Sequence, residues 1–304
     1  MRRNTAVNLI QKTEQSFSGV TVLKVVAEGV KPFAAMQIIH GSLEYKERYM
    51  PFIKFLAERG YVVYISDLRG HGANVSAEYP RGHMKDVWEI IDDQKDVNNL
   101  IRAEYPSIPH ILFGHSLGSI FARLYTAKYD DSIDCLILSG TANRRPFASL
   151  GPIVVDIVSI FTGGMKGHAR ILNRMSGLDA PTDEWLSYSK RNLENHRNDP
   201  NMIPMFTNGG FKILFKADSL LNKKKLYRFK NPKLPILSVT GEDDPVTGFK
   251  KGLTASMRFL GKVGYHNLES IVYPHMMHEV LNEDEGEKVM KDIDSFIRKS
   301  LKLF

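Results

Sequence analysis

The chain alternates between short runs of buried-type residues and longer segments in which apolar residues recur every three or four positions. The short runs are rich in Val and Ile and end at Gly or Pro, which is the pattern of buried strands. The first 140 residues predict strands over 20–26, 34–39, 61–66, 110–113 and 133–138, with helices over 47–59, 85–103 and 117–128. Strands that alternate with helices predict crossover connections and a mostly parallel sheet.

This alternation stops after residue 140 and resumes near residue 232. The segment between them has no strand–helix rhythm, but it contains several helix-like patches rich in Met and Phe. Strands are predicted again over 234–240 and 267–272, and helices over 248–260 and 285–301. The pattern therefore predicts an α/β fold, a doubly wound domain built from residues 1–140 and 232–304. A helical cap, residues 141–231, is inserted between two of its strands.

Composition agrees with a globular domain of this size. Of the 304 residues, 43% are hydrophobic and 25% are charged, which is ordinary for a soluble protein. The single cysteine, Cys135, cannot form an intrachain disulfide and fits a reducing compartment. Polar residues interrupt the segment 8–15, where a signal peptide would be apolar, and no apolar run approaches the ~18 residues of a membrane span. We therefore expect a cytoplasmic protein.

The net charge of +7 raises the question of an anionic partner. Acidic and basic residues are interspersed, which is typical of a solvated surface. The densest basic run, residues 223–228, lacks the aromatic interleaving of a nucleic-acid surface, so no nucleic-acid partner is expected. Transient contact with a membrane surface is the alternative use of the positive charge.

The chain has no pattern that indicates a cofactor or a metal ion. Neither Cys-x-x-Cys nor His-Glu-x-x-His occurs. The turn Asp67-Leu68-Arg69-Gly70-His71-Gly72 lacks phosphate-binding spacing. It is interpreted as a structural turn in which Arg69 and His71 bond to the backbone and to Asp67.

The strongest chemical signal is Gly114-His115-Ser116-Leu117-Gly118, which stands between a predicted strand and a predicted helix. This is the context of a nucleophile elbow, whose tight turn requires glycines and exposes the serine hydroxyl. Ser116 is therefore the predicted nucleophile, and the amide of Leu117 is a predicted oxyanion donor. A second donor is expected from the loop after the strand 34–39, where Gly41 lets the backbone approach and the amide of Ser42 is the candidate.

A serine nucleophile needs a base, and the base needs an orienting acid. In this type of fold the acid and then the histidine follow the serine along the chain. The turn after residue 240 offers Glu242, Asp243 and Asp244, and the residues alone do not choose among them. The later loop offers His275 and His278, of which His278 is the better base because it lies just before the last helix.

Taken together, the ordered motifs resemble α/β-hydrolases of the monoacylglycerol lipase and lysophospholipase group. The residues that carry the resemblance run from His40-Gly41 with Glu44 and Tyr49, through the Asp67 turn and the Ser116 elbow, to Gly241-x-x-Asp244, Tyr273, His278-Glu279 and Asn282-Glu283; within the cap they are Asp183 to Ser187, Asn198-Asp199-Pro200 and Gly210-Phe211. The resemblance implies Ser116, Asp244 and His278 as a catalytic triad, with the amides of Ser42 and Leu117 as the oxyanion hole. Tyr45 departs from the group, in which His often follows the equivalent of Glu44.

The function expected from this set is hydrolysis of carboxylic esters of single-chain lipids through an acyl-enzyme. Apolar cap residues should line an acyl pocket, with Met276 and Met277 near its floor and His115 also lining it; the other cap residues should pack a small core of the cap's own. The alternatives are an aminopeptidase anchored by Asp183-Glu184, a thioesterase or acyltransferase on the same triad, and a non-catalytic binding protein.

Overall fold

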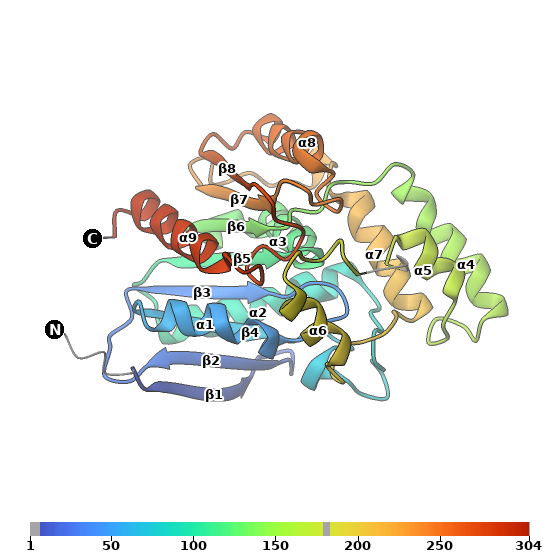
Figure 1. Cartoon of the computed structure of the whole chain (residues 1–304), viewed down its shortest axis with the longest axis horizontal. Coiled ribbons are helices and arrows are strands. Elements are labelled where there is room, and N and C mark those ends of the chain that lie inside the picture. Colours follow the sequence, from blue (N-terminus) through green and yellow to red (C-terminus); the bar gives the residue numbers. More distant parts are fainter. Residues whose placement is uncertain (1–6, 179–182, 304) are drawn as a thin grey trace.

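The computed structural model describes residues 7–178 and 183–303. Within these residues the chain forms an eight-stranded sheet in the order β1-β2-β4-β3-β5-β6-β7-β8 (Figure 1). The strands are β1 (Leu9–Gln15), β2 (Thr21–Ala27), β3 (Ala34–Ile39), β4 (Tyr61–Ser66), β5 (His110–His115), β6 (Cys135–Ser139), β7 (Ile236–Gly241) and β8 (Leu268–Tyr273). β2 runs antiparallel to β1 and β4, and the other pairs are parallel. The predicted α/β-hydrolase fold, with its mostly parallel sheet, is confirmed.

The β1 strand was not predicted from the sequence. Its seven residues are mostly exposed, because it is an edge strand that pairs only with β2. A strand with little buried surface leaves no run of Val and Ile, so the pattern that marks β3 and β4 is missing here.

Helices cover both faces of the sheet. On one side α1 (Met50–Ala57) and α9 (Gly286–Leu301) pack on a cluster that includes Ile111 and Phe113 of β5. On the other side α2 (Val87–Glu104), α3 (Leu117–Tyr129) and α8 (Phe249–Val263) pack on a cluster that includes Leu112 of the same strand. Alternate residues of a strand point to opposite faces, so a continuous apolar strand serves both layers.

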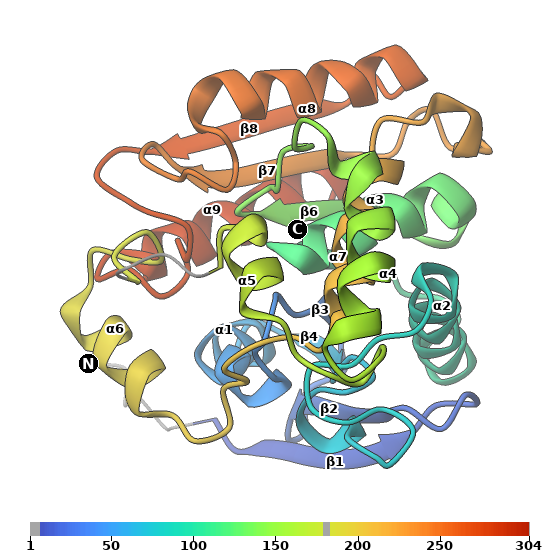
Figure 2. The same ribbon diagram turned by 90° about the vertical axis from the view of Figure 1, so that its right-hand side faces the viewer.

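In the described part of the chain between β6 and β7, four further α-helices cover the carboxyl ends of the parallel strands (Figures 1 and 2). They are α4 (Gly151–Phe161), α5 (Arg170–Ser176), α6 (Lys190–Asn198) and α7 (Asn208–Leu220). The α7 helix begins where the Thr207 hydroxyl accepts a hydrogen bond from the amide of Gly210, at 3.2 Å. All four fall inside the predicted cap, residues 141–231; the limits of core and cap themselves stay a prediction.

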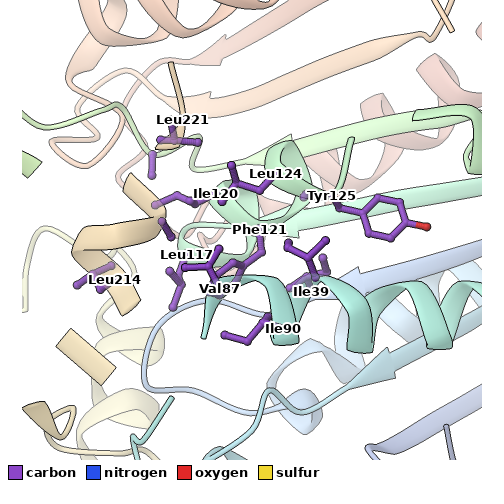
Figure 3. Packing of buried hydrophobic residues seen from close by; sticks show 14 of the residues in the cluster. Ile39, Val87, Ile90, Leu117, Ile120, Phe121, Leu124, Tyr125, Leu214 and Leu221 are labelled. Atoms are coloured by element: carbon purple, nitrogen blue, oxygen red, sulfur yellow. The ribbon is translucent and has the colours of Figure 1, made fainter. Parts of the chain in front are cut away.

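Contrary to expectation, the described residues of the cap do not form a separate hydrophobic core. Leu214 and Leu221 belong to the same buried cluster as Leu117 and Ile120 of α3, and Figure 3 shows these side chains next to one another. The reason is that α7 packs directly on α3, the helix that follows the Ser116 turn. Cap and sheet therefore share one apolar interior next to that turn.

No helix in residues 7–178 and 183–303 combines the length and the apolar character needed to cross a membrane.

Candidate active site

Ser116 occupies the sharp turn between β5 and α3, with backbone angles φ 53° and ψ −118°. This conformation is uncommon for a residue with a side chain and marks local strain. The turn closes because its glycines have no side chains. A Cβ at Gly118 would lie 2.1 Å from the carbonyl oxygen of Ile39, and one at Gly114 would lie 2.3 Å from that of Gly118. The structure thus has the elbow that the sequence predicts, and it leaves the Ser116 side chain half-buried at the cavity wall.

His278 and Asp244 form a buried pair in the loops that follow β8 and β7. The Nδ1 atom of His278 lies 3.0 Å from Oδ2 of Asp244. Hydrogen bonds to the Asp244 carboxylate come also from the hydroxyls of Thr240 and Thr247 and from the backbone amides of Val246 and Thr247. The Nε2 atom of His278 is buried and has no hydrogen-bond partner among the described residues. The hydrogen bond to Asp244 thus orients the ring through Nδ1, and Nε2 is free of hydrogen bonds to the described residues.

Asp243 and His275, the other candidate acid and base in these two loops, lie outside this buried pair. Asp243 accepts a hydrogen bond from the Tyr188 hydroxyl in an exposed position, 3.0 Å away. His275 has a left-handed backbone, φ 54°, and an exposed side chain, as expected for a loop residue. Of the three carboxylates that the sequence left open, Asp244 is the one bonded to His278.

Burial and charge act in opposite directions on this pair. Burial disfavours the charged form of His278, but Asp244 and, farther away, Glu279 and Glu44 outweigh it, so the pKa of His278 is raised. Burial would raise the pKa of Asp244, yet His278 and the Thr247 hydrogen bonds hold that pKa well below its usual range. For His115, burial and the neighbouring His278 lower the pKa to about 4, so its ring is neutral at neutral pH.

The loop after β3 lies against the serine. A Cβ built at Gly41 would be 3.2 Å from Cβ of Ser116, so the backbone approaches as closely as a glycine allows. Ser42 and Leu117 both line the cavity, and the backbone amide of neither has an acceptor among the described residues. Glu44 holds the loop from behind, since its Oε1 accepts hydrogen bonds from the Gly41 amide and from the Tyr49 hydroxyl at 2.6 Å.

A cavity of about 440 Å³ opens over Ser116, Leu117, Ser42 and His278. Its apolar wall comes from both cap and core. Apolar residues of this wall include Leu43, Ile120, Leu178, Trp185, Leu186, Met202, Ile203, Leu214, Phe215 and Val246. His115 also lines the cavity.

The prediction that Met276 and Met277 form the floor of this cavity is wrong. Neither residue lines it. Met276 is 3% exposed and packs in the cluster beneath the sheet with α9, and the amide of Met277 is bonded to Glu283. The turn that brings His278 toward the cavity directs the two methionines away from it.

Comparison with known proteins places the chain in a family. A family model described as serine aminopeptidase, S33, matches residues 30–285. The chain belongs to this family. It is 26% identical to the monoacylglycerol lipase of Mycolicibacterium smegmatis over 301 residues, which cover 94% of this chain and 97% of that protein. It is 27% identical to phospholipase YtpA of Bacillus subtilis over 272 residues, 88% of this chain and 95% of the relative.

Solved structures of the same fold extend over almost the whole chain. A thermostable carboxyl esterase from Bacillus coagulans, in complex with glycerol, superimposes with a TM-score of 0.83 at 26% identity and covers 97% of this chain and 99% of that one. A monoglyceride lipase variant from Saccharomyces cerevisiae superimposes with a TM-score of 0.73 over 98% of this chain and 96% of its own, at 19% identity, and shows the fold alone. The resemblance to the monoacylglycerol lipase and lysophospholipase group is confirmed.

Around the site of this S33 family member lies an ionic network that sequence reasoning missed. Arg48 Nη2 contacts Oε2 of Glu279 at 2.9 Å, and Nη1 lies 3.6 Å from Oε2 of Glu44. Asn192 of the cap donates to the same Glu279 oxygen at 2.8 Å. Glu279 follows His278 directly, so the network ties the loop of the base to the oxyanion loop and the cap. Arg48 and Glu279 are 231 positions apart, and no local pattern could pair them.

The Asp67 turn is structural, but its contacts differ from those expected. Arg69 forms a bidentate pair with Asp93 of α2, at 2.7 and 2.8 Å, and not with Asp67. Asp67 instead accepts from the Lys46 ammonium at 2.6 Å. His71 bonds to the backbone carbonyl of Arg69 as predicted. In the described parts of the chain, no cluster of three His, Cys, Asp or Glu side chains is arranged to hold a metal ion.

Proposed function

We propose that this protein is a serine hydrolase that cleaves carboxylic esters of single-chain lipids through Ser116, His278 and Asp244. One observation carries the proposal: a strained serine turn and the histidine of a buried His–Asp pair border one cavity whose wall is largely apolar. The names of two relatives, a monoacylglycerol lipase and a phospholipase, point to the same class of substrate.

In the proposed first step Ser116 Oγ attacks the ester carbonyl carbon while His278 Nε2 accepts the hydroxyl proton. The unpartnered, buried Nε2 supports this role, because a base must have a free nitrogen facing the reaction. Asp244 stabilises the imidazolium and keeps the ring in the required tautomer. The free amides of Ser42 and Leu117 receive the developing oxyanion, and Glu44 keeps the Ser42 loop in position from below.

Collapse of the tetrahedral intermediate expels the alcohol, which takes the proton from His278. An acyl group is then left on Ser116. Water that gives its proton to His278 attacks this acyl-enzyme, and the fatty acid leaves as Ser116 regains its proton. Each group acts in both steps, so the mechanism needs no residue beyond the proposed triad and the two amide donors.

The size and lining of the cavity support one alkyl chain. A volume of about 440 Å³ is near the lower end for small-molecule sites. The Leu, Ile and Phe side chains that enclose it can remove methylenes from water, and each buried methylene stabilises binding by ~0.8 kcal/mol. Three acyl chains of a triacylglycerol would not fit, whereas the single chain of a monoacylglycerol or lysophospholipid would.

An aminopeptidase is the second candidate, and the description of the family model favours it. Such an enzyme needs a free carboxylate to bind the substrate's ammonium group. Each described carboxylate of the cavity wall already has a polar partner. Arg48 forms ion pairs with Glu44 and Glu279, and Arg197 forms one with Asp183. The Tyr45 hydroxyl donates a hydrogen bond to Asp199, and the backbone amide of Arg145 donates one to Asp218. This arrangement favours the lipid ester.

The test is a direct comparison of substrates on the purified protein. We expect hydrolysis of monoacylglycerol and lysophospholipid, little cleavage of aminoacyl amides, and covalent labelling of wild type but not of Ser116→Ala by a fluorophosphonate. Labelling of Ser116→Ala would exclude this serine as the nucleophile. Preferential cleavage of aminoacyl amides would make the peptidase the better assignment.

A further inference from the structure

Trp185 of the cap lies against the ring of the proposed base. The centroids of its indole and of the His278 imidazole are 5.5 Å apart, and the two ring planes are tilted by 39°. Trp185 also lines the cavity over Ser116 and is partly exposed there. An aromatic face attracts a cation within about 6 Å of its centroid, and tryptophan does so most strongly. The indole is thus placed where it stabilises a protonated His278.

The other ring against His278 does not have this effect. The centroid of His115 lies 4.9 Å from that of His278, at an interplanar angle of 41°. Burial and the charge of His278 lower the pKa of His115, so a positive charge on one ring disfavours a positive charge on the other. The carboxylates that favour the imidazolium are Asp244, Glu279 and Glu44, and all three belong to the core of the protein. The cap adds the indole.

A buried carboxylate holds the segment that follows Trp185. Glu283 is 7% exposed and lies in the loop that leads from β8 to α9. Its oxygens accept a hydrogen bond from the Ser187 hydroxyl at 2.8 Å and from the backbone amides of Tyr188 and Ser189 at 3.0 Å. This carboxylate therefore fixes the path of the backbone directly after the indole.

The same carboxylate holds the loop of the base. Glu283 also accepts a hydrogen bond from the amide of Met277 at 2.9 Å, and Met277 immediately precedes His278. A further bond joins the two segments directly, because the amide of Glu279 donates to the carbonyl of Leu186 at 2.7 Å. The cap segment is therefore bonded to the residues on both sides of His278.

We propose that Trp185 is a positioning residue of the reaction: Glu283 fixes the indole over the His278 ring, where it stabilises the imidazolium formed in the first step. The inference rests on the proposed function, because it concerns the proton transfer of that mechanism. The contacts of Glu283 are made within the protein itself, so the indole needs no rearrangement when charge develops on the base. The cap thus contributes to the chemistry as well as to the cavity wall.

The first test is the pH dependence of kcat and kcat/KM for a short chromogenic ester. Trp185→Leu keeps an apolar wall but has no ring, so kcat should fall about three- to thirtyfold and the acid limb should move to lower pH. Trp185→Phe keeps a weaker ring and should lie between the leucine variant and wild type. An acid limb that Trp185→Leu leaves in place, or a change in KM alone, would overturn the proposal.

The second test does not depend on turnover. Trp88, in α2, is the other of the two tryptophans, so Trp88→Phe leaves Trp185 as the single emitter and should keep wild-type activity. Protonated imidazole quenches indole fluorescence on contact. The emission should therefore fall on acidification with the midpoint of the acid limb, also in an added Ser116→Ala, and His278→Gln should remove this transition.

The two tests separate the possible failures. An inactive protein that still shows the fluorescence transition would sink the proposed function and leave the ring contact intact. An active protein whose Trp185 emission does not respond to the protonation of His278 would refute the role of the indole.

The role of Glu283 is tested with Glu283→Gln, which keeps one acceptor oxygen and leaves donors of both segments unpaired. The fluorescence transition should weaken and the acid limb should move to lower pH. Adding Glu283→Gln to Trp185→Leu should cost little further kcat, because the carboxylate acts through the indole. If Glu283→Gln does not fold, Ser187→Ala, which removes one donor, allows the same comparison. Additive losses of kcat, or an unchanged transition in the folded variant, would contradict this role.

Discussion

The Nδ1 atom of His278 lies 3.0 Å from Oδ2 of Asp244 in a site where His278 is only 2% exposed and Asp244 not at all. Because the carboxylate outweighs burial, the pKa of His278 is raised above its ordinary value of about 6.5. In the proposed mechanism only the neutral ring accepts a proton. We therefore expect kcat/KM to fall about tenfold per pH unit below that raised pKa and to level off above it.

The pH profile has an internal control in Asp244→Asn. Loss of the carboxylate removes the stabilisation of imidazolium, so the acid limb should move to lower pH while the plateau drops. A wild-type limb well below pH 6.5, or one that Asp244→Asn leaves in place, would contradict the assignment of His278 as the base.

Replacement of the nucleophile or the base should abolish turnover without unfolding the protein. Ser116→Ala and His278→Ala are each expected to lower kcat by ~10³-fold or more, because each removes one member of a unit that acts together. Turnover of a chromogenic ester measures the loss, and circular dichroism checks the fold. Near-wild-type activity in folded Ser116→Ala would exclude the proposed mechanism.

The two adjacent aspartates should differ sharply. Asp244→Asn is expected to lower kcat by ~10³-fold or more, since the amide no longer selects the working tautomer of His278. Asp243→Asn is the matched control and should keep most activity, because the Asp243 carboxylate accepts a hydrogen bond from the exposed Tyr188 hydroxyl and is not bonded to His278. Comparison of kcat in the two folded variants gives the answer, and the opposite order would move the acid to Asp243.

Acyl-chain length should control kcat/KM until the cavity is full. Each added methylene should raise kcat/KM up to about fourfold from acetate to medium chains. Leu214→Trp, which enlarges a side chain of the cavity wall, should shorten the preferred chain while acetate hydrolysis is retained. A p-nitrophenyl ester series measures both effects, and a flat profile in wild type would count against an acyl pocket.

Arg48 should contribute more to stability than an exposed arginine. Arg48→Met would leave Glu44 and Glu279 buried without their shared cation, and we expect a loss of ~3–5 kcal/mol in the free energy of unfolding. Arg197→Met, which breaks the more exposed pair with Asp183, is the control and should change stability little. Urea unfolding of both variants measures the difference. Equal stability of Arg48→Met and wild type would show that the network does not hold the loops.

The parts of this protein that were predictable from sequence are those specified by neighbouring residues. The strand, the turn and the helix around Ser116 are specified by residues that are neighbours in the sequence. The elbow needs glycines because a side chain there would collide with backbone atoms of the turn itself or of the adjacent strand. β3 and β4 were predictable because a strand buried on both faces must be apolar throughout. The exposed β1 has no such requirement and left no signal.

Only the tertiary structure could decide which residues meet across the chain. Asp243 and Asp244 are chemically alike, and the turn after β7 alone determines which of them faces His278. The same is true of Met276 and Met277, whose apolar character fits a pocket wall and a core equally well. Arg48 meets Glu44 and Glu279, and α7 packs on α3, through contacts between segments far apart in sequence. Hydrophobic patterning specifies that a residue is buried, but its partner depends on how the elements are packed.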